Sequence, residues 1–115
     1  MAADPDCIFC KIVAGEIPAA VVRRTDRLVA FRDVSPQAPV HVLVIPTAHI
    51  VSLPEVEDGA LLGEMLMLAR DIARDEKIAA DGYRVVFNTN RNGGQTVFHL
   101  HLHLLGGRRL TWPPG

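Results

Sequence analysis

An uninterrupted alternation of polar and apolar residues near the end of the chain, VFHLHLHLL over 97–105, constrains the fold more than any other feature. Three histidines alternate there with three leucines: His99, His101 and His103 with Leu100, Leu102 and Leu104. Successive side chains of a strand point to opposite faces of a sheet. The pattern therefore predicts a strand over about 97–105, with the leucines in a core and the histidines together on the other face.

Further strands and two helices are predicted around this strand. Runs rich in β-branched and apolar residues predict four strands, over 19–25, 28–34, 40–46 and 83–90. A short helix is predicted over 6–14, and apolar residues at helical spacing predict a long helix over about 58–79.

The end of the chain, 106–115, is rich in Pro and Gly and is predicted to be irregular. A length of 115 residues suits one domain, over 1–115. Because strands outnumber helices and the later strands are joined by a short turn, the predicted class is α+β, with a five-stranded, mainly antiparallel sheet.

Composition excludes several kinds of partner. A net charge of −1 and an aromatic content of 5% argue against a nucleic-acid-binding surface. No apolar stretch reaches the roughly 20 residues that a membrane span requires, and the start MAADPDCIFC does not resemble a signal peptide. We therefore expect a cytoplasmic protein without membrane or nucleic-acid partners, whose two cysteines are thiols or metal ligands.

The histidine row favours a reaction over a three-histidine metal centre. Neighbouring histidines on one face of a strand are about 6.6 Å apart and the outer two about 13 Å apart, too far for both to bind one zinc ion. The middle residue, His101, is the natural centre of a reaction. Donors precede it, namely Gly93, Gly94, Gln95 and Thr96. A neutral imidazole beside fixed donors suits phosphoryl or nucleotidyl transfer.

Several segments resemble one family. HLHLHLL matches the motif of the histidine triad (HIT) superfamily, in which three histidines alternate with apolar residues. CIFCKIVAGEIPA, AFRDVSPQAPVHVLVIPTAHI, GYRVVFNTN, GGQTVFHLHLHLLGGR and WPPG are similar to the Hint branch, the histidine triad nucleotide-binding proteins. The resemblance implies the HIT fold and a homodimer whose two five-stranded sheets form one ten-stranded sheet. It also implies a purine nucleoside phosphoramidase, which cleaves the P–N bond of AMP or GMP conjugates of amines and requires no cofactor.

The resemblance assigns roles to individual residues. His101 is the expected nucleophile and becomes nucleotidylated, while His99 and His103 position phosphate and handle protons. His41 is a further catalytic histidine, and Asp33 binds the ribose hydroxyls. The expected walls of the base site are Ile8, Phe9, Ile12, Phe31, Val34 and Leu43. The expected contacts on the phosphate side are Asn88, Gly94, Gln95, Thr96 and Val97.

Two positions depart from the family pattern. Thr96 stands where the family usually has serine, so the hydroxyl is kept on a stiffer, β-branched side chain. We expect activity to be retained with an altered preference for the leaving group. Arg32 stands where the branch often has histidine, at the rim of the base site.

Cys7 and Cys10 have the spacing of metal ligands, but such a pair makes only half of a zinc site. His49 and His99 are the candidates to complete it, as the resemblance to zinc-binding bacterial relatives that begin with CIFC implies. The zinc would be structural, since protein atoms would fill all four positions. Two free thiols on a short helix are the alternative.

Other functions fit parts of the sequence. Dinucleoside polyphosphate hydrolysis, as in the Fhit branch, uses the same triad, but the ending GGR…WPPG favours the Hint branch. A nucleotide-binding interaction protein is a second alternative, although the intact triad favours catalysis. A metal-binding module is the third, and it explains neither Asp33 nor the GGQT segment.

Overall fold

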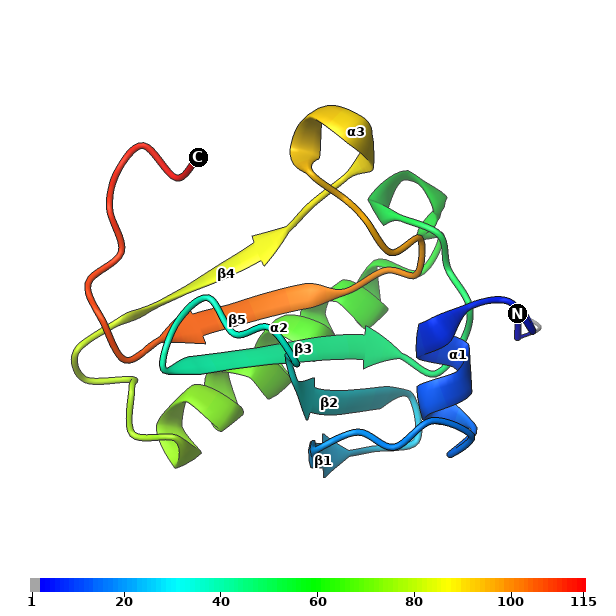
Figure 1. The fold of residues 1–115 in the computed structure, drawn as a ribbon, viewed down its shortest axis with the longest axis horizontal. Helices are drawn as coiled ribbons and strands as arrows, with labels where there is room; N and C mark the ends of the chain where they lie inside the picture. Colours follow the sequence, from blue (N-terminus) through cyan, green and yellow to red (C-terminus); the bar gives the residue numbers. More distant parts are fainter. Residues whose placement is uncertain (1–2) are drawn as a thin grey trace.

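The computed structural model describes residues 3–115; residues 1 and 2, which the predicted domain includes, lie outside the described part. Five strands form one sheet in the order β1-β2-β3-β5-β4, and every neighbouring pair is antiparallel (Figure 1). The strands are β1 (Val21–Arg24), β2 (Leu28–Arg32), β3 (Val40–Pro46), β4 (Tyr83–Phe87) and β5 (Leu102–Gly106). The predicted α+β class with a five-stranded antiparallel sheet is confirmed.

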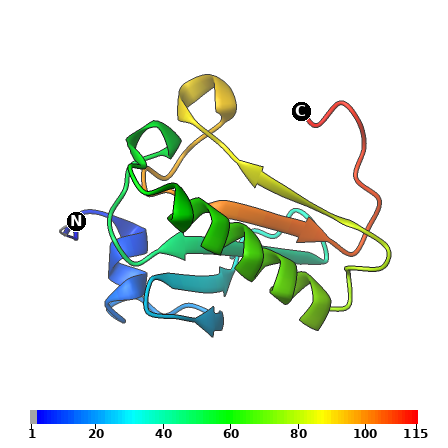
Figure 2. The ribbon, with the colours of Figure 1, turned by 180° about the vertical axis from the view of Figure 1, so that it is seen from behind.

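Each face of the sheet buries its own apolar cluster. The long helix α2 (Gly59–Asp75) crosses one face (Figure 2), where Val42, Val44, Leu102 and Leu104 pack under Met65 and Ile72. The short helix α1 (Ile8–Val13) covers part of the other face, where Phe9 packs with Phe31, Leu43 and Ile45. The strand alternation decides this division, since neighbours such as Val42 and Leu43 point to opposite faces. The candidate site lies on the α1 face.

Helix α2 is shorter than the predicted 58–79 because a capping motif ends it. Asp58 caps its start, accepting a hydrogen bond from the Ala60 N–H. At its end the Ile78 N–H bonds to the Ala73 carbonyl and the Lys77 N–H to the Arg74 carbonyl. Lys77 has a positive φ of 63°, which turns the chain out of the helix.

The histidine-bearing strand begins later than predicted. β5 covers Leu102–Gly106, whereas the alternation predicted about 97–105. The antiparallel register pairs Val44 with Leu102, so continuing it would place His101 opposite Ile45 and Leu100 opposite Pro46. Pro46 has no N–H to donate, and the Leu100 N–H bonds instead to the Ile50 carbonyl. His99 and His101 therefore lie just outside the regular strand.

The predicted short turn between the last two strands contains a one-turn helix, α3 (Asn90–Gly93), which Gly94 ends with a φ of +83°. A single 3₁₀ turn, η1 (Leu53–Glu55), lies between β3 and α2. The predicted helix over 6–14 is Ile8–Val13, and the chain beyond Gly106 has no regular secondary structure. Among residues 3–115, no helix has the length and apolar character needed to span a bilayer.

Candidate active site and metal centre

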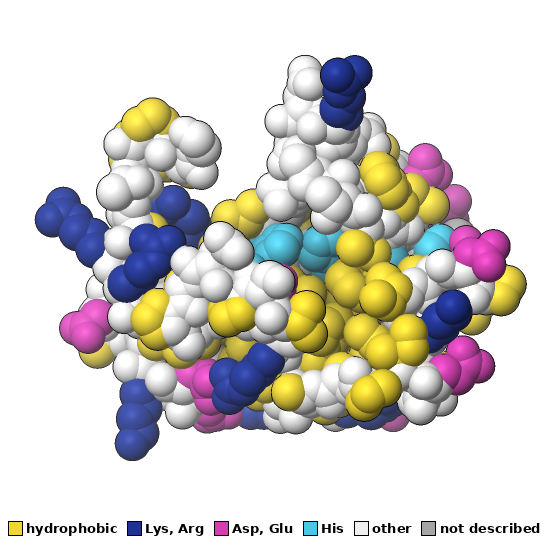
Figure 3. Space-filling model, viewed as in Figure 1, with side chains coloured by type: hydrophobic (Ala, Val, Ile, Leu, Met, Phe, Trp, Pro, Cys, Tyr) yellow, Lys and Arg dark blue, Asp and Glu magenta, His cyan; other side chains and the backbone are white. Residues whose placement is uncertain are grey.

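Four histidines and a carboxylate meet on the α1 face of the sheet. His41 lies on β3 and His103 on β5, while His99 and His101 lie on the segment that leads into β5. Figure 3 shows histidine atoms in a row across the middle of this face, beside a patch of hydrophobic side chains. The structure therefore brings together the predicted triad and His41.

His101 is oriented by the backbone. Its Nδ1 lies 2.8 Å from the carbonyl oxygen of His99, which can only accept, so Nδ1 carries a proton and donates. Nε2 of the neutral ring is left with a free lone pair. The edge-to-face ring of Phe9, with centroids 5.2 Å apart, fixes the imidazole from the side. Burial lowers the pKa of His101, which keeps this lone pair unprotonated.

A hydrogen-bond chain fixes His41 and His103. The backbone N–H of Gln37 donates to Nδ1 of His41 at 3.0 Å, so the proton of neutral His41 is on Nε2. His41 Nε2 lies 2.9 Å from Nδ1 of His103 and donates to it. His103 consequently carries its own proton on Nε2. Burial, with the neighbouring His101 and His41, lowers the pKa of His103 to about 4.

Asp33 lies beside this chain, directly after β2. One carboxylate oxygen accepts the N–H of Ser35 at 2.8 Å, and the other lies 3.5 Å from Nε2 of His41. The Asp33 N–H donates to the His41 carbonyl at 3.0 Å, which joins the two residues through the backbone as well. The carboxylate is half-buried and keeps acceptor capacity for a further donor.

The six residues predicted as base walls differ in position. Phe9, Phe31 and Leu43 are buried in the apolar cluster of the α1 face, and Ile12 packs against it. Ile8 is exposed on α1, and Val34, with 97% of its surface exposed, projects from the loop after β2. The first four form a floor, and the other two stand free at its rim.

The GGQT segment has a different arrangement from the one its glycines suggested. The N–H groups of Gly94 and Gln95 bond to the carbonyls of Arg91 and Asn90. The buried amide of Gln95 donates to the carbonyls of Val51 and Val97 and accepts the Asn90 N–H. Gln95 therefore holds the loop in place through these three hydrogen bonds, and its donors do not face the site.

Thr96 and Val97, two of the predicted phosphate contacts, lie beyond Gln95 in the same segment. Within the described chain, no protein acceptor is seen for their N–H groups or for the Thr96 hydroxyl. They border a cavity of about 310 Å³ that Asp4, Asp6 and Ile8 line from the other side. Asn88, which follows β4, is half-buried.

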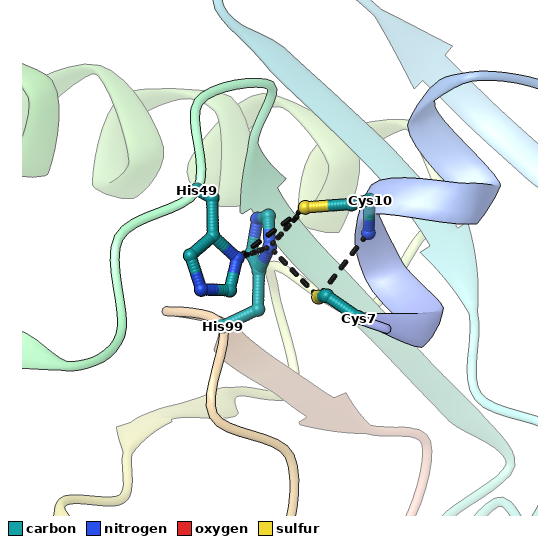
Figure 4. Close-up of side chains that lie close together, drawn as sticks. All are labelled: Cys7, Cys10, His49 and His99. Atoms are coloured by element: carbon teal, nitrogen blue, oxygen red, sulfur yellow. Dashed lines mark hydrogen bonds between the residues drawn. The ribbon is translucent and has the colours of Figure 1, made fainter. Parts of the chain in front are cut away.

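A second cluster lies at the start of α1 (Figure 4), where Cys7, Cys10, His49 and His99 point to one spot. Nδ1 of His99 lies 3.4 Å from the sulfur of Cys7, 3.5 Å from that of Cys10 and 3.3 Å from Nδ1 of His49. Tetrahedral zinc with ordinary bond lengths requires about 3.3 Å between nitrogens and about 3.6 Å between sulfur and nitrogen. The cluster has the dimensions of a zinc site.

The outer nitrogens of both histidines support the same conclusion. Nε2 of His99 donates to the Pro46 carbonyl at 2.8 Å, so its Nδ1 lone pair faces the cluster. Nε2 of His49 lies 3.9 Å from a carboxylate oxygen of Asp4. Partners of this kind orient metal-binding histidines. Burial raises the pKa of Cys10, so that thiol stays protonated until a cation draws off its proton. These residues fit a metal ion.

Asp33, His41 and His103 form a third close group that does not fit a metal. A metal-binding histidine keeps its proton on the other ring nitrogen, where it donates to an acceptor. Nδ1 of His41 instead accepts the Gln37 N–H. A cation on Nε2 would therefore leave that ring without any proton. The group serves as a hydrogen-bond chain.

Sequence reasoning missed the backbone groups of the site. The Pro46 carbonyl, the His99 carbonyl and the Gln37 N–H set the proton positions of three histidines. Pro46 ends a predicted strand, which is a signal that pairing must stop there. No side-chain pattern marks the Gln37 N–H.

The fold and the site define an α+β protein with a histidine triad at the start of a sheet strand. A family model described as the HIT domain matches residues 14–110. The chain belongs to the HIT domain family, which confirms the family predicted from the sequence.

Individual relatives cover most of the chain. The purine nucleoside phosphoramidase of Escherichia coli K12 is 51% identical over 107 residues, 91% of this chain and 90% of that protein. A HIT family hydrolase from Legionella pneumophila has a TM-score of 0.93 at 53% identity, covering 96% of this chain and 100% of the other. A zinc-bound histidine triad protein from Mycobacterium smegmatis has a TM-score of 0.83 at 31% identity, covering 93% and 81%.

Proposed function

We propose that this protein is a purine nucleoside phosphoramidase, a hydrolase that cleaves the P–N bond of a purine nucleoside 5′-phosphoramidate such as AMP linked to an amine. The observation that carries the proposal is the orientation of His101, whose Nδ1 donates to the His99 carbonyl and leaves Nε2 as a lone pair in an apolar setting. The similarity to the E. coli phosphoramidase supports the substrate class.

In the first half of the reaction, Nε2 of His101 attacks the α-phosphorus. The P–N bond to the amine breaks as the bond to His101 forms, and the amine leaves with a proton. Thr96 and Val97 supply N–H donors for the phosphorus oxygens, and His103 points a protonated Nε2 toward the reaction. The apolar floor, which includes Phe31 and Leu43, receives the purine. Asp33 accepts hydrogen bonds from the ribose hydroxyls.

In the second half, water attacks the phosphorus of the nucleotidyl-His101 intermediate. The P–N bond to the imidazole breaks, AMP leaves, and the lone pair returns to Nε2. The attacking water gives up one proton to the solvent, which balances the proton that the amine took up from it. The intermediate divides one difficult substitution into two easier ones. No step uses a metal.

The test is turnover of adenosine phosphoramidate by the wild type and by His101→Asn. We expect loss of at least about a thousandfold in kcat, because removing a nucleophile removes the covalent route. Turnover of His101→Asn at the wild-type rate would refute the mechanism. Diadenosine triphosphate in the same assay tests the alternative substrate class and should be hydrolysed more slowly than the phosphoramidate.

For the second cluster we propose a structural zinc ion held by Cys7, Cys10, His49 and His99. Zinc would tie α1 to the loop after β3 and to the triad segment, and four protein ligands would leave no position for water. Metal analysis of protein purified without chelator should give about one zinc per chain. A stoichiometry near zero would remove the proposal and leave two free thiols.

We also propose a homodimer that forms along β4. This strand is an edge of the sheet and exposes Tyr83 and Val85. The opposite edge, β1, is four residues long, has an irregular register and carries Arg23 and Arg24, features that discourage strand pairing. Light scattering at micromolar concentration should give twice the chain mass.

A further inference from the structure

A chain of contacts connects an arginine after the triad strand to the catalytic histidines. We propose that Arg108 is a positioning residue for the reaction, and that it acts through Gln37 on His41. The proposal rests on the phosphoramidase function proposed above. Arg108 touches none of the three triad histidines in the hydrogen bonds of the described chain, so its effect must pass through the loop between β2 and β3.

Arg108 binds that loop at one atom. Its Nη2 donates to the Gln37 carbonyl at 2.9 Å, and its Nε donates to the same oxygen at 3.3 Å. A third nitrogen, Nη1, donates to the Arg109 carbonyl and anchors the guanidinium to its own segment. The planar guanidinium presents its donors in a fixed geometry, so it holds the carbonyl in direction as well as distance.

The backbone around Arg108 is fitted to the loop. Gly107 has a φ of +89°, and a Cβ placed on it would lie 2.9 Å from Cβ of Pro39. Only glycine allows this approach. The segment Gly106–Arg108 is therefore seated against the loop, and the guanidinium reaches Gln37 from a fixed base.

Inside the loop, the bond from the Gln37 amide to the Ser35 carbonyl, at 2.8 Å, and the bond from the Ser35 N–H to Asp33 tighten the turn. These bonds place no direct restraint on the Gln37 N–H. Arg108 holds the carbonyl of the same residue, so Gln37 is fixed at its side chain and at its carbonyl while its N–H donates to Nδ1 of His41.

The direction of that N–H decides where the proton of His41 lies. With Nδ1 occupied as an acceptor, His41 donates from Nε2 to Nδ1 of His103, which leaves the proton of His103 on its Nε2. Without it, the His41 proton is free to move to Nδ1, and His103 loses its donor. Arg108 thus supports the proton arrangement, and its own hydrogen bonds go to Gln37 and Arg109, not to Asp33.

The experiment compares Arg108→Ala, Arg108→Lys and the control Arg109→Ala in the full chain. Arg109 is the neighbouring exposed arginine, and only its carbonyl takes part in these contacts. We expect kcat to fall about tenfold in Arg108→Ala and less in Arg108→Lys, with KM changing less than twofold. Arg109→Ala should keep the wild-type kcat.

A double-mutant cycle with His41→Ala separates positioning from general damage to the fold. If Arg108 acts through His41, Arg108→Ala should lower kcat by less than twofold in the His41→Ala background, because the two effects are not additive. An equal loss in both backgrounds overturns the proposal, as does an unchanged kcat in the single variant.

Nitrogen-15 NMR of the histidine rings gives a readout that needs no activity. His41 should be in the Nε2–H form in the wild type and in Arg109→Ala, and a mixture of both tautomers in Arg108→Ala. An unchanged His41 spectrum in Arg108→Ala overturns the positioning role. If the wild type hydrolyses no phosphoramidate, the proposed function fails on its own, and the tautomer measurement still decides the role of Arg108.

Discussion

Single histidines in this protein owe their proton positions to backbone atoms. The carbonyls of Pro46 and His99 accept hydrogen bonds from the rings of His99 and His101, and the Gln37 N–H donates to Nδ1 of His41. His103 differs, because the Nε2–H of His41 sets its proton position. Backbone partners hold a ring in one tautomer without adding a titrating group, so the site stays in one protonation state over a wide pH range.

This arrangement predicts the acid side of the pH profile. Burial lowers the pKa of His101, His103 and His41 from the ordinary value of 6.5. Neutral rings are the active forms here, so kcat should stay constant as the pH falls through 6.5 and decrease only at lower pH. Steady-state rates between pH 4 and 8 measure this, and an acid limb at or above 6.5 would contradict it.

Gln95 is predicted to contribute mainly to the stability of the fold. Its buried amide makes three hydrogen bonds to the backbone. Gln95→Ala leaves those backbone groups unpaired and should lower the free energy of unfolding by about 2 kcal/mol. Urea denaturation measures the change, with Asn92→Ala on exposed α3 as the control. Equal stabilities of the two variants would exclude this role.

At the scale of an element, α1 belongs to two sites. One side carries Cys7 at its cap and Cys10, and the other carries Phe9, which touches both His99 and His101. The helix has six residues, too few to be stable alone. The position of α1 therefore depends on its packing against the apolar cluster and on the ligand that binds the two thiols.

The second cluster, formed by Cys7, Cys10, His49 and His99, is predicted to bind zinc with an affinity that depends on pH. Zinc binding displaces the proton of Cys10, whose pKa burial raises, so protons compete more strongly as the pH falls. Zinc affinity should decrease steadily from pH 8 to pH 6 and be lost in Cys10→Ser. Competition with a chromophoric chelator measures it. A constant affinity over this range would show that the thiol is not a ligand.

At the scale of the whole molecule, buried neutral histidines set the acid stability of the metal-free protein. The pKa of both His99 and His103 is lowered to about 4, mainly by burial. The unfolded chain takes up protons near pH 6.5 and the folded chain does not, so stability present above 6.5 is lost as the pH falls toward 4. Each histidine accounts for about 3 kcal/mol of this loss.

Chelator-treated protein, unfolded in urea at pH 7, 5.5 and 4.5, measures the effect. His103→Gln removes one titrating ring and should flatten the curve relative to the wild type. An identical pH dependence in the two proteins would mean that His103 titrates normally.

The sequence predicts the large-scale order well, because it depends on periodic patterns. The alternation in β5 and the helical spacing in α2 both reflect one buried face. Element ends are harder. Helix α2 ends at Asp75 because Lys77 adopts a left-handed conformation, which the composition does not predict. Strand β5 begins at Leu102 because of Pro46, a proline 56 residues earlier.

The site shows the same limit. His41, His99, His101 and His103 are found from residue type and motif, and the structure brings them together. Gln95 acts through a hydrogen bond to a backbone carbonyl 44 residues away, and the Gln37 N–H acts as a backbone donor to the side chain of His41. No local sequence pattern predicts such partners, so these parts of the site are seen only in the folded structure.

His99 belongs to the metal cluster through its side chain and to the nucleophile through its carbonyl oxygen. The first role uses the side chain, which a substitution changes. The second uses the backbone carbonyl, which every residue has. A substitution at position 99, or at either cysteine, would remove a ligand of the proposed zinc ion and keep the carbonyl that orients His101. Descendants of such a protein would therefore be free to lose zinc one ligand at a time while natural selection preserves the chemistry.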